Sequence, residues 1–472
     1  MIISSLWIAS ALAADVVLSP GDDVASKTAV LNAGDNVFFG DGVFEIASDL
    51  YWTGAGTADA PIRLTKAEGA DPILRITGGY FLIHVDAATF LTIEGITLAG
   101  AEGWEENGWN GITMSGSSDI TLKDLELRNL GAGIDIGDGS RISITGTEIH
   151  DITGEAIDAG CGDASCWLAD STIQGNWIHD LVGENQTAIG LDHGGQGNLI
   201  ADNVIHDTLY HGIYAGSTEF GPQNTVRGNA VFDVGGSGLV IEGSALVQNN
   251  IVFRAGDYGI YVSDTDRNTL QDVAISFNTV AETGQWGAWL RDWPGHTGMV
   301  FANNVIANPL GYGMDYDRDD YTAADPSNQL AGNLVTGLVE DMDIEVHPTG
   351  ALPGAGYADF LDAPNGNFYP VRDSLLVNAA DPAGENYVPT DDFNGAVRQG
   401  DVPDVGAYEW TAEANPGWTI EPGFKVLGVT EVTGGADVGG GCCGKDGTGE
   451  AGFGLLPLAG LLWLRRRRAA CT

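Results

Sequence analysis

Basic residues are scarce in this chain of 472 residues. Lys and Arg together number 20 against 65 Asp and Glu, which gives a formal net charge of −45. Because phosphate binding requires basic surface, this balance argues against a nucleic-acid partner. It also disfavours a bare polyanionic substrate, unless a metal ion bridges the negative charges. Abundant carboxylates instead suit a salty or calcium-containing exterior.

Cysteine is also rare, with five residues in the chain. Cys161 and Cys166 bracket four residues, and in an oxidising compartment they can close a small disulfide loop. A zinc site would need more ligands than this loop supplies. Cys442, Cys443 and Cys471 belong to a separate tail.

Long hydrophobic runs are confined to the two ends of the chain. Residues 1–14 are apolar and end in small residues, as in a signal peptide, although the basic start of such a peptide is missing. A buried first strand is the alternative. Near the other end, the apolar stretch 452–464 is shorter than the roughly 20 residues of a stable membrane span. Four Arg residues follow it, and the positive-inside rule would keep them cytoplasmic.

The tail resembles a known targeting signal. Residues 442–472 combine a Cys pair, the apolar stretch and the Arg cluster, and they resemble the C-terminal sorting signals of myxobacterial surface proteins. The resemblance implies export, cleavage near the Cys pair and anchoring through a lipid on Cys442 or Cys443; a simple tail anchor is the alternative. We therefore expect a monomer that is exported and either secreted or held at the cell surface or outer membrane by its tail.

Glycine is abundant, with 69 residues, roughly twice the usual share. No G-X-Y period accompanies it, so the chain is not collagen-like. Many short apolar runs separated by Gly predict short strands joined by tight turns.

An internal repeat is the main signal in the sequence. An Asn precedes an apolar pair at intervals of 27, 26, 21, 28, 26 and 29 residues; the positions are Asn176, Asn203, Asn229, Asn250, Asn278, Asn304 and Asn333. This spacing is too long for a hairpin, and the composition is too rich in Gly and β-branched residues for a helical repeat. It predicts a solenoid of parallel strands in which the Asn side chains form an internal ladder between coils.

A second strand in each repeat fixes which side chains point inward, because side chains alternate along a strand. The predicted first inward column is Ile134, Ile157, Ile189, Ile213, Leu239, Ile260, Ala288 and Met314. The second inward column, two residues on in each coil, is also apolar except for Tyr316. The residues between and beside these columns then face outward.

At this point the sequence resembles the right-handed parallel β-helix proteins of the pectate-lyase-like superfamily. Three stretches carry the resemblance: residues 56–76, which look like the first coils of β-helix polysaccharide lyases, the repeats over about residues 80–335, and the closing motif at residues 392–410. The expected fold is all-β, a parallel β-helix of about ten or more coils over residues 15–410. We expect a cap over the first ~55 residues, irregular final turns over 336–410 and a Gly-rich linker over 411–441. This fold hosts lyases, hydrolases, epimerases and passive adhesins, so it does not decide the function.

One outward face is rich in aromatic side chains. Exposed rings on a flat β face are surfaces on which sugars stack, worth about 1 kcal/mol each. The predicted substrate-binding residues are Tyr214, Tyr258, Tyr261, Trp286, Trp289 and Tyr312. Packing of these rings under long loops is the alternative. We favour a polysaccharide as partner because polar and aromatic residues converge on this face.

Acidic residues share that face. Asp135 and Asp158 fall in one column on neighbouring coils, about 4.8 Å apart. Such a pair either raises the pKa of one carboxyl or holds a hard cation such as calcium, with solvated surface acids as the alternative. Asp192 and Glu242 fall two coils apart, about 9–10 Å, near the upper end of the carboxylate separation in inverting glycosidases.

The remaining catalytic candidates lie close to these acids. His211 falls on the coil between Asp192 and Glu242, and Arg291 falls two coils beyond Glu242. A β-elimination lyase needs a base, which in lyases of the resembled family is commonly Lys or Arg. Lys123 is the only Lys in the repeats and lies on another strand, so His211, Tyr214 or Arg291 would have to substitute. The leading hypothesis is a polysaccharide lyase or glycoside hydrolase, and the alternative is a non-catalytic glycan-binding or adhesion scaffold.

A repeated "IHD" sequence adds three histidines, His150, His179 and His206, at one position of the repeat. A metal ladder is conceivable there. Because the same position becomes Phe in later coils, we predict a stacked surface ladder instead.

Overall fold

A computed structural model describes residues 13–104, 108–160, 167–191, 195–217, 221–265, 269–293, 296–316, 327–342, 345–354, 356–412, 418–422 and 424. Residues 1–429 form one compact unit, and residues 430–472 are a second unit, outside the described residues. Several sequence predictions fall outside them as well: most of the signal segment, the Cys161–Cys166 loop, Asp192, Cys442, Cys443 and the apolar stretch 452–464. Within the described ranges, no helix has the length and apolar character to cross a membrane.

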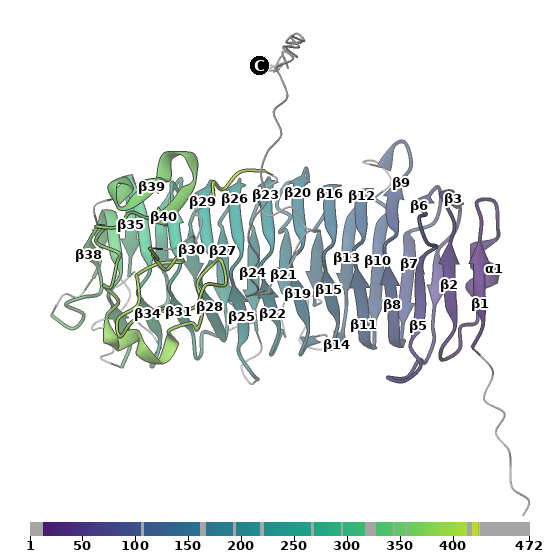
Figure 1. The fold of residues 1–472 in the computed structure, drawn as a ribbon, viewed down its shortest axis with the longest axis horizontal. Helices are drawn as coiled ribbons and strands as arrows, with labels where there is room; N and C mark the ends of the chain where they lie inside the picture. Colours follow the sequence, from purple (N-terminus) through teal and green to yellow (C-terminus); the bar gives the residue numbers. More distant parts are fainter. Residues whose placement is uncertain are drawn as a thin grey trace, which may run out of the picture. The chain divides into compact units, whose positions relative to one another are not determined.

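Short parallel strands stack into three ladders (Figure 1). The first ladder is a 15-stranded sheet. It contains β1 (Asp15–Leu18), β2 (Asn36–Phe39), β5 (Ile62–Lys66), β8 (Thr89–Glu94), β11 (Ser117–Lys123), β14 (Gly139–Ser140), β15 (Ser143–Thr145), β18 (Leu168–Ala169), β19 (Thr172–Gln174), β22 (Leu199–Ala201), β25 (Asn224–Arg227), β28 (Ala245–Gln248), β31 (Ala274–Ser276), β34 (Val300–Ala302) and β36 (Gln329–Ala331).

The other two ladders belong to a 23-stranded sheet. The second ladder contains β4 (Leu50–Trp52), β7 (Phe81–Asp86), β10 (Asn110–Ser115), β13 (Ala132–Ile136), β17 (Ile157–Ala159), β21 (Ile189–Leu191), β24 (Ile213–Gly216), β27 (Leu239–Glu242), β30 (Ile260–Val262) and β33 (Trp286–Leu290). The third contains β3 (Gly42–Ile46), β6 (Pro72–Ile76), β9 (Thr97–Gly100), β12 (Glu126–Leu130), β16 (Glu148–Ile152), β20 (Trp177–Leu181), β23 (Val204–Thr208), β26 (Ala230–Val234), β29 (Ile251–Ala255), β32 (Thr279–Ala281), β37 (Leu334–Glu340) and β38 (Leu352–Pro353). The long strand β35 (Val305–Asp315) pairs with β33 and β32 and so joins the two ladders.

The three ladders close into a parallel β-helix, which confirms the predicted fold class. The predicted inward columns are confirmed as well. Strand pairing runs from Ile134 through Ile157 and the rest of the first column to Met314, and each of these side chains is buried. Tyr316, the one polar member of the second column, is also fully buried. These stacked apolar columns form the core.

The asparagine ladder is present as predicted. Asn229, for example, accepts hydrogen bonds from the backbone N–H (3.0 Å) and side-chain amide (2.9 Å) of Asn203. Its own amide donates to the carbonyl of Ile200 and to Asn250, each at 2.9 Å. The same pattern repeats from Asn176 to Asn333, and every member is buried. The ladder therefore satisfies polar backbone groups at one corner of each coil from Asn176 to Asn333.

The three histidines of the third ladder stack, as predicted. Ring centroids lie 5.1 Å apart between His150 and His179, and 5.2 Å apart between His179 and His206. In each repeat the next residue, an Asp, adopts a positive φ of 50–53°, and its carboxylate lies 2.8 Å from the histidine Nδ1. The ladder is less exposed than predicted, because the side chain of His206 is only 3% exposed.

The coils begin earlier than the sequence indicated. β1 to β4 already pair with strands of the first, second and third ladders, so the strands between residues 15 and 52 belong to the turns of the β-helix. The short helix α1 (Val24–Thr28) packs near β4, where the Thr28 hydroxyl accepts a 3.0 Å hydrogen bond from the Trp52 indole. Buried and partly exposed side chains alternate in β2, with Val37 and Phe39 facing the core as in the later coils.

Residues 356–412, here called the closing segment, do not extend the stack. They contain the 3₁₀ turns η2 (Gly356–Asp359), η3 (Ala363–Asn365) and η4 (Pro382–Tyr387) and the hairpin of β39 (Phe360–Asp362) and β40 (Asn367–Pro370). The segment packs back onto earlier coils: Phe368 contacts Phe253, with ring centroids 5.0 Å apart, and Asp391 pairs with Arg227 at 2.8 Å. An apolar cluster shared with β26, β29 and β32 holds it there.

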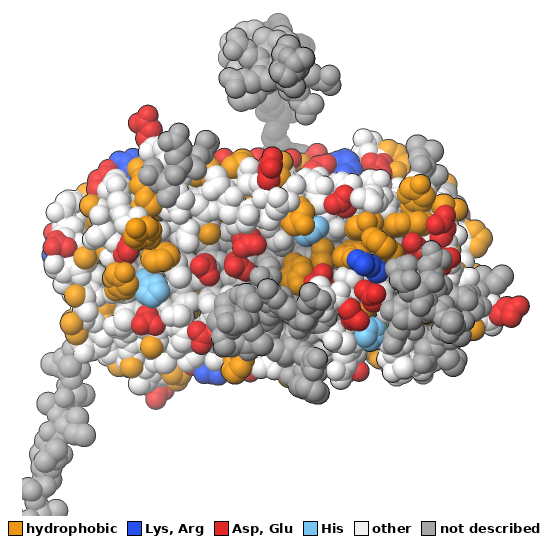
Figure 2. Space-filling model, turned by 180° about the vertical axis from the view of Figure 1, so that it is seen from behind, with side chains coloured by type: hydrophobic (Ala, Val, Ile, Leu, Met, Phe, Trp, Pro, Cys, Tyr) orange, Lys and Arg blue, Asp and Glu red, His pale blue; other side chains and the backbone are white. Residues whose placement is uncertain are grey.

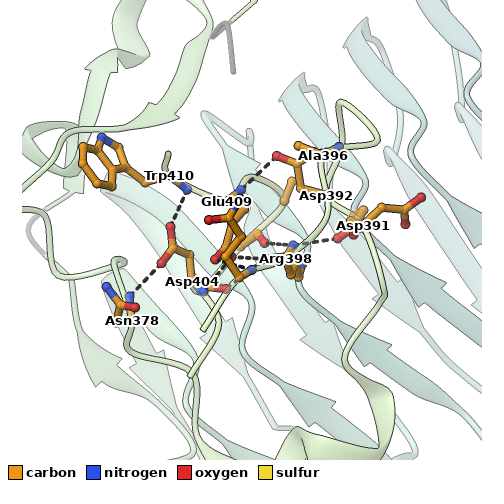
Figure 3. Close-up of polar contacts among 12 residues, drawn as sticks. Asn378, Asp391, Asp392, Ala396, Arg398, Asp404, Glu409 and Trp410 are labelled. Carbon is orange, nitrogen blue, oxygen red and sulfur yellow. Dashed lines mark hydrogen bonds and ion pairs between the residues drawn. The ribbon is translucent and has the colours of Figure 1, made fainter. Parts of the chain in front are cut away.

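A buried arginine fixes the closing segment (Figure 3). Arg398 donates a hydrogen bond to Asn249, the residue before ladder member Asn250, at 2.8 Å and another to the carbonyl of Gly406 at 2.7 Å. Its guanidinium also pairs with Glu409 at 3.4 Å. Asp404 accepts hydrogen bonds from the backbone N–H groups of Asn378 and Trp410. Burial raises the pKa of Asp404 to about 6.

We predict that Asn229→Ala lowers the free energy of unfolding by about 3–5 kcal/mol, because the backbone and side-chain amides of Asn203 and the carbonyl of Ile200 lose a buried partner. Urea denaturation measures this change. Asn365→Ala is the matched control, because the Asn365 side chain makes one exposed hydrogen bond, to Asp362, and its loss should cost under about 0.5 kcal/mol. Equal effects of the two substitutions would contradict the role of the ladder.

Asp404 should make stability depend on pH in an unusual direction. Its pKa of about 6 lies above the value of about 3.9 in an unfolded chain, so between these values the folded protein holds a proton that the unfolded chain has released. The contribution of this group to the free energy of unfolding is therefore full below about pH 4 and is lost as the pH rises through about 6, by roughly 2–3 kcal/mol. Urea titrations of wild type and Asp404→Asn from pH 4 to 7 should diverge by this amount; parallel curves would contradict it.

Candidate functional site

The outward side chains of the second ladder form the candidate site. Strand pairing places Asp135, Asp158, Gly190, Tyr214, Val240, Tyr261, Trp289 and Asp315 in one column, as predicted. A parallel ladder repeats the same outward position about every 4.8 Å, so these side chains form a continuous strip. On the face seen in Figure 2, hydrophobic side chains gather around a basic one, and acidic side chains lie close by.

A cavity of about 680 Å³ opens over the C-terminal half of this strip. Its lining residues come from successive coils and from the turns that precede the strands. They are Glu155, Asn185, Thr187, Tyr210, His211, Tyr214, Ser237, Val240, Glu242, Asp257, Tyr258, Tyr261, Trp289 and Arg291.

A tyrosine and a carboxylate are joined at the centre of the lining. The Tyr214 hydroxyl of β24 donates a short hydrogen bond to Glu242 of β27, one coil further on. Glu242 is 8% exposed, and the Ser263 hydroxyl approaches its other oxygen at 3.4 Å. Because Tyr214 is only partly buried, the pair connects the cavity to a buried carboxylate. Such a pair can pass a proton to or from a bound molecule.

His211 lies beside this pair and is held neutral. Burial lowers the pKa of His211 to about 4, although the nearby Asp257 opposes the shift. The backbone N–H of Ser237 donates to His211 Nδ1 at 2.9 Å, so the neutral ring carries its proton on Nε2. His211 is therefore set up to donate a hydrogen bond at neutral pH rather than to accept a proton.

The far end of the cavity is aromatic. The rings of Tyr258, Tyr261 and Trp289 contact one another, with centroids 5.0–5.3 Å apart. Arg291 donates to the Tyr261 hydroxyl at 3.1 Å and lies 5.7 Å from the Trp289 ring. Arg291 is the only Lys or Arg among the described lining residues, which also include three carboxylates. The cavity therefore offers flat apolar surface in an acidic setting.

Comparisons with known proteins agree with this architecture. A model of the right-handed β-helix region matches residues 110–280. The A-module of the mannuronan C-5 epimerase AlgE6 from Azotobacter vinelandii superposes with a TM-score of 0.52 at 14% identity, covering 68% of this chain and 91% of that one. The fold is a right-handed parallel β-helix.

The PL6 family polysaccharide lyase Pedsa3628 from Pseudopedobacter saltans superposes with a TM-score of 0.50 at 14% identity, covering 74% of this chain and 90% of that one. No curated protein matches the sequence. Structural similarity at such low identity shows the shared fold alone, so the chemistry of the site has to be argued from this chain's own residues.

The structure brings most of the predicted site residues together. His211, Tyr214, Glu242, Tyr258, Tyr261, Trp289 and Arg291 all line the cavity. Trp286 and Tyr312 pair on neighbouring strands with ring centroids 4.6 Å apart, and neither is among the lining residues. Asp192 and the Cys161–Cys166 pair lie outside the described residues, so their predicted roles stay predictions.

The proposed calcium ligands lie on the same strip but outside the cavity. Asp135 and Asp158 occupy paired positions on β13 and β17. Burial raises the pKa of Asp135, which a bound cation would counteract. Among the described residues, no group of three or more His, Cys, Asp or Glu side chains is arranged to hold a metal ion. The prediction of a calcium site therefore depends on Asp135 and Asp158 alone.

Sequence reasoning missed three lining residues, Asn185, Tyr210 and Asp257. The ring of Tyr210 lies 3.7 Å from that of His211, and Asp257 accepts a 2.9 Å hydrogen bond from the Gln285 amide. Tyr210 and Asp257 directly precede His211 and Tyr258, and Asn185 lies two residues before Thr187. Extending the column alignment by two residues toward the N-terminus would have found all three.

We predict that His211 titrates near pH 4 and stays neutral from pH 5 to 8. Histidine NMR signals followed against pH report this, with His211→Asn used for assignment. His150 and His179 are internal controls: burial opposes their protonation, but neighbouring carboxylates outweigh it and raise the pKa of each above 6.5. A His211 signal that titrates at or above the ordinary histidine pKa of about 6.5 would contradict the assigned environment.

Proposed function

We propose that this protein cleaves a polysaccharide in the cavity of the second ladder, with Tyr214 and Glu242 as the proton-transfer pair. The observation that carries the proposal is their hydrogen bond inside a cavity walled by Tyr258, Tyr261 and Trp289. Sugar rings stack on aromatic faces, and glycosidic bonds break by acid–base catalysis with carboxyl groups. The β-helix supplies both in one groove.

In this proposal each polar group has a distinct task. Glu242 acts as the base or acid, and Tyr214 relays the proton between Glu242 and the bound sugar. His211 donates a hydrogen bond from its Nε2–H to an oxygen that gains negative charge, and the imidazole keeps its proton and stays neutral. Arg291 and the three rings position the chain.

The charge of the lining favours hydrolysis over β-elimination. A lyase must bind and neutralise an acidic sugar, and the described lining places three carboxylates against one Arg. A hydrolase acting on an uncharged sugar does not face this repulsion. A polyuronate lyase would need a bridging cation, for which Asp135 and Asp158 are the proposed calcium ligands.

A non-catalytic glycan-binding scaffold is the second candidate. The packed cluster of Tyr258, Tyr261 and Trp289 favours it, because such a platform binds sugars without any proton transfer. We further propose that the protein is exported and held at the cell envelope, supported by the apolar residues 1–14 and by the Cys pair, apolar stretch and Arg cluster of the tail.

We predict that Glu242→Gln and Tyr214→Phe each lower product release by about 10²–10⁴-fold while polysaccharide binding persists. A panel of neutral and acidic polysaccharides, read for reducing ends and for the ultraviolet absorbance of unsaturated uronates, measures the release and separates hydrolase from lyase.

The matched control is Tyr357→Phe, because Tyr357 donates a 2.7 Å hydrogen bond to Glu282 outside the cavity. This substitution removes the same chemical group and should leave release unchanged. Binding of a polysaccharide without any release by wild type would favour the scaffold, and release that survives both cavity substitutions would refute the proton-transfer pair.

A further inference from the structure

A second group of aromatic side chains lies at the N-terminal end of the second ladder. We call Tyr51, Tyr80, Phe81 and His84 the N-terminal aromatic patch. Tyr51 and Tyr80 are 57% and 77% exposed, although large apolar rings are normally covered. The ring of His84 lies between those of Tyr51 and Phe81, with centroids 5.4 Å and 5.7 Å away. The patch is therefore a cluster of two exposed rings, Tyr51 and Tyr80, beside two half-buried ones, Phe81 and His84.

This patch is continuous with the cavity. Strand pairing connects Tyr51 to His84, His84 to Thr113 and Thr113 to Asp135, the first member of the cavity's own column. Seven strand-to-strand steps separate His84 from Tyr261, and at about 4.8 Å each they span about 34 Å. One straight outward column thus has rings at both ends.

Between the patch and Tyr214, where the cavity begins, the column carries only small side chains. The residues of this stretch are Thr113, Asp135, Asp158 and Gly190, none of which carries a ring or a long side chain. Short hydroxyl and carboxyl groups are hydrogen-bond partners for sugar hydroxyls. The carboxylates also repel a polyanion. The strip therefore fits an extended chain of uncharged sugars.

The view in Figure 2 shows the same order along one face. Hydrophobic side chains gather in two separate places, each beside a histidine, and acidic side chains lie between them.

We propose that the N-terminal aromatic patch is a distal subsite that binds the same uncharged polysaccharide chain that enters the cavity. This inference rests on the proposed function, because it takes the cavity as the place where the chain is cleaved or held. The occupant is a glycan rather than a second protein, because the patch continues a sheet column whose other end forms the aromatic cavity.

A distal subsite makes binding depend on chain length. A polysaccharide long enough to cover about 34 Å engages both ends, and the second contact then forms at a high effective concentration. An oligosaccharide that fills only the cavity gains nothing from the patch. The protein should therefore prefer long chains over short ones.

The test uses the double substitution Tyr51→Ala/Tyr80→Ala in the full chain. The probes are soluble neutral glucan, mannan, galactan and xylan, with polygalacturonate as the acidic comparison, and short oligosaccharides of whichever polymer binds. We expect the double substitution to weaken binding of the long neutral chain by about tenfold and to leave binding of the short oligosaccharide unchanged.

Trp167→Ala is the control, because Trp167 is also an exposed aromatic residue (48%) but precedes β18 of the first ladder. It should leave binding unchanged, and thermal unfolding should show that all variants are folded. Equal loss for long and short ligands, no loss at all, or the same loss in Trp167→Ala would each overturn the subsite.

Binding is measured in the Glu242→Gln background as well, so that the two proposals fail separately. Length-dependent loss of binding in that background supports the subsite even if product release that persists in Glu242→Gln shows that Glu242 is not catalytic. The converse result is that Glu242→Gln lowers product release as predicted while the patch variants still bind long chains as tightly as wild type. That result would retain the proposed function and refute the subsite. Preference for polygalacturonate over all neutral chains would overturn the substrate class.

Discussion

Hydrogen bonding between successive coils is the constraint on which the rest of the molecule depends. Each strand pairs in register with the same position of the coils before and after it, and the asparagine ladder adds side-chain hydrogen bonds between coils. A slip of one residue would turn every inward side chain outward and break the asparagine ladder. The register is therefore held twice, by apolar burial and by the amides of Asn176 to Asn333.

That register is also what turns isolated residues into a site. Tyr214 and Glu242 are 28 residues apart in the chain, yet they meet because adjacent coils repeat the same outward positions. The surroundings then set the protonation state of the neighbouring His211. Burial keeps its ring neutral, and the hydrogen bond from the Ser237 backbone fixes Nε2 as the nitrogen that carries the proton. The candidate site is therefore built from side chains stacked on successive coils rather than from a motif along the chain.

The sequence was sufficient for the parts of the structure that repeat. Alternation and spacing predicted the inward columns, the Asn ladder and seven residues of the cavity, because each follows from a fixed coil length. Features that depend on non-repeating contacts were not predictable in this way. The path of the closing segment, the buried Arg398 and the pKa of His211 all arise from residues far apart in the chain, and no period in the sequence marks them. The early start of the coils at Asp15 was missed because the first strands lack the Asn signal.

The closing segment has a consequence for the order in which the protein folds. Its contacts span long stretches of chain: 164 residues separate Arg227 from Asp391, and 149 separate Asn249 from Arg398. Solenoids grow by adding neighbouring coils, so the docking surface for Asp391 and Arg398 exists only after those coils have formed. The segment is also synthesised after them. Docking of Arg398 therefore requires central coils that are already in register, and only then can the closing segment cover the apolar side chains around Phe253.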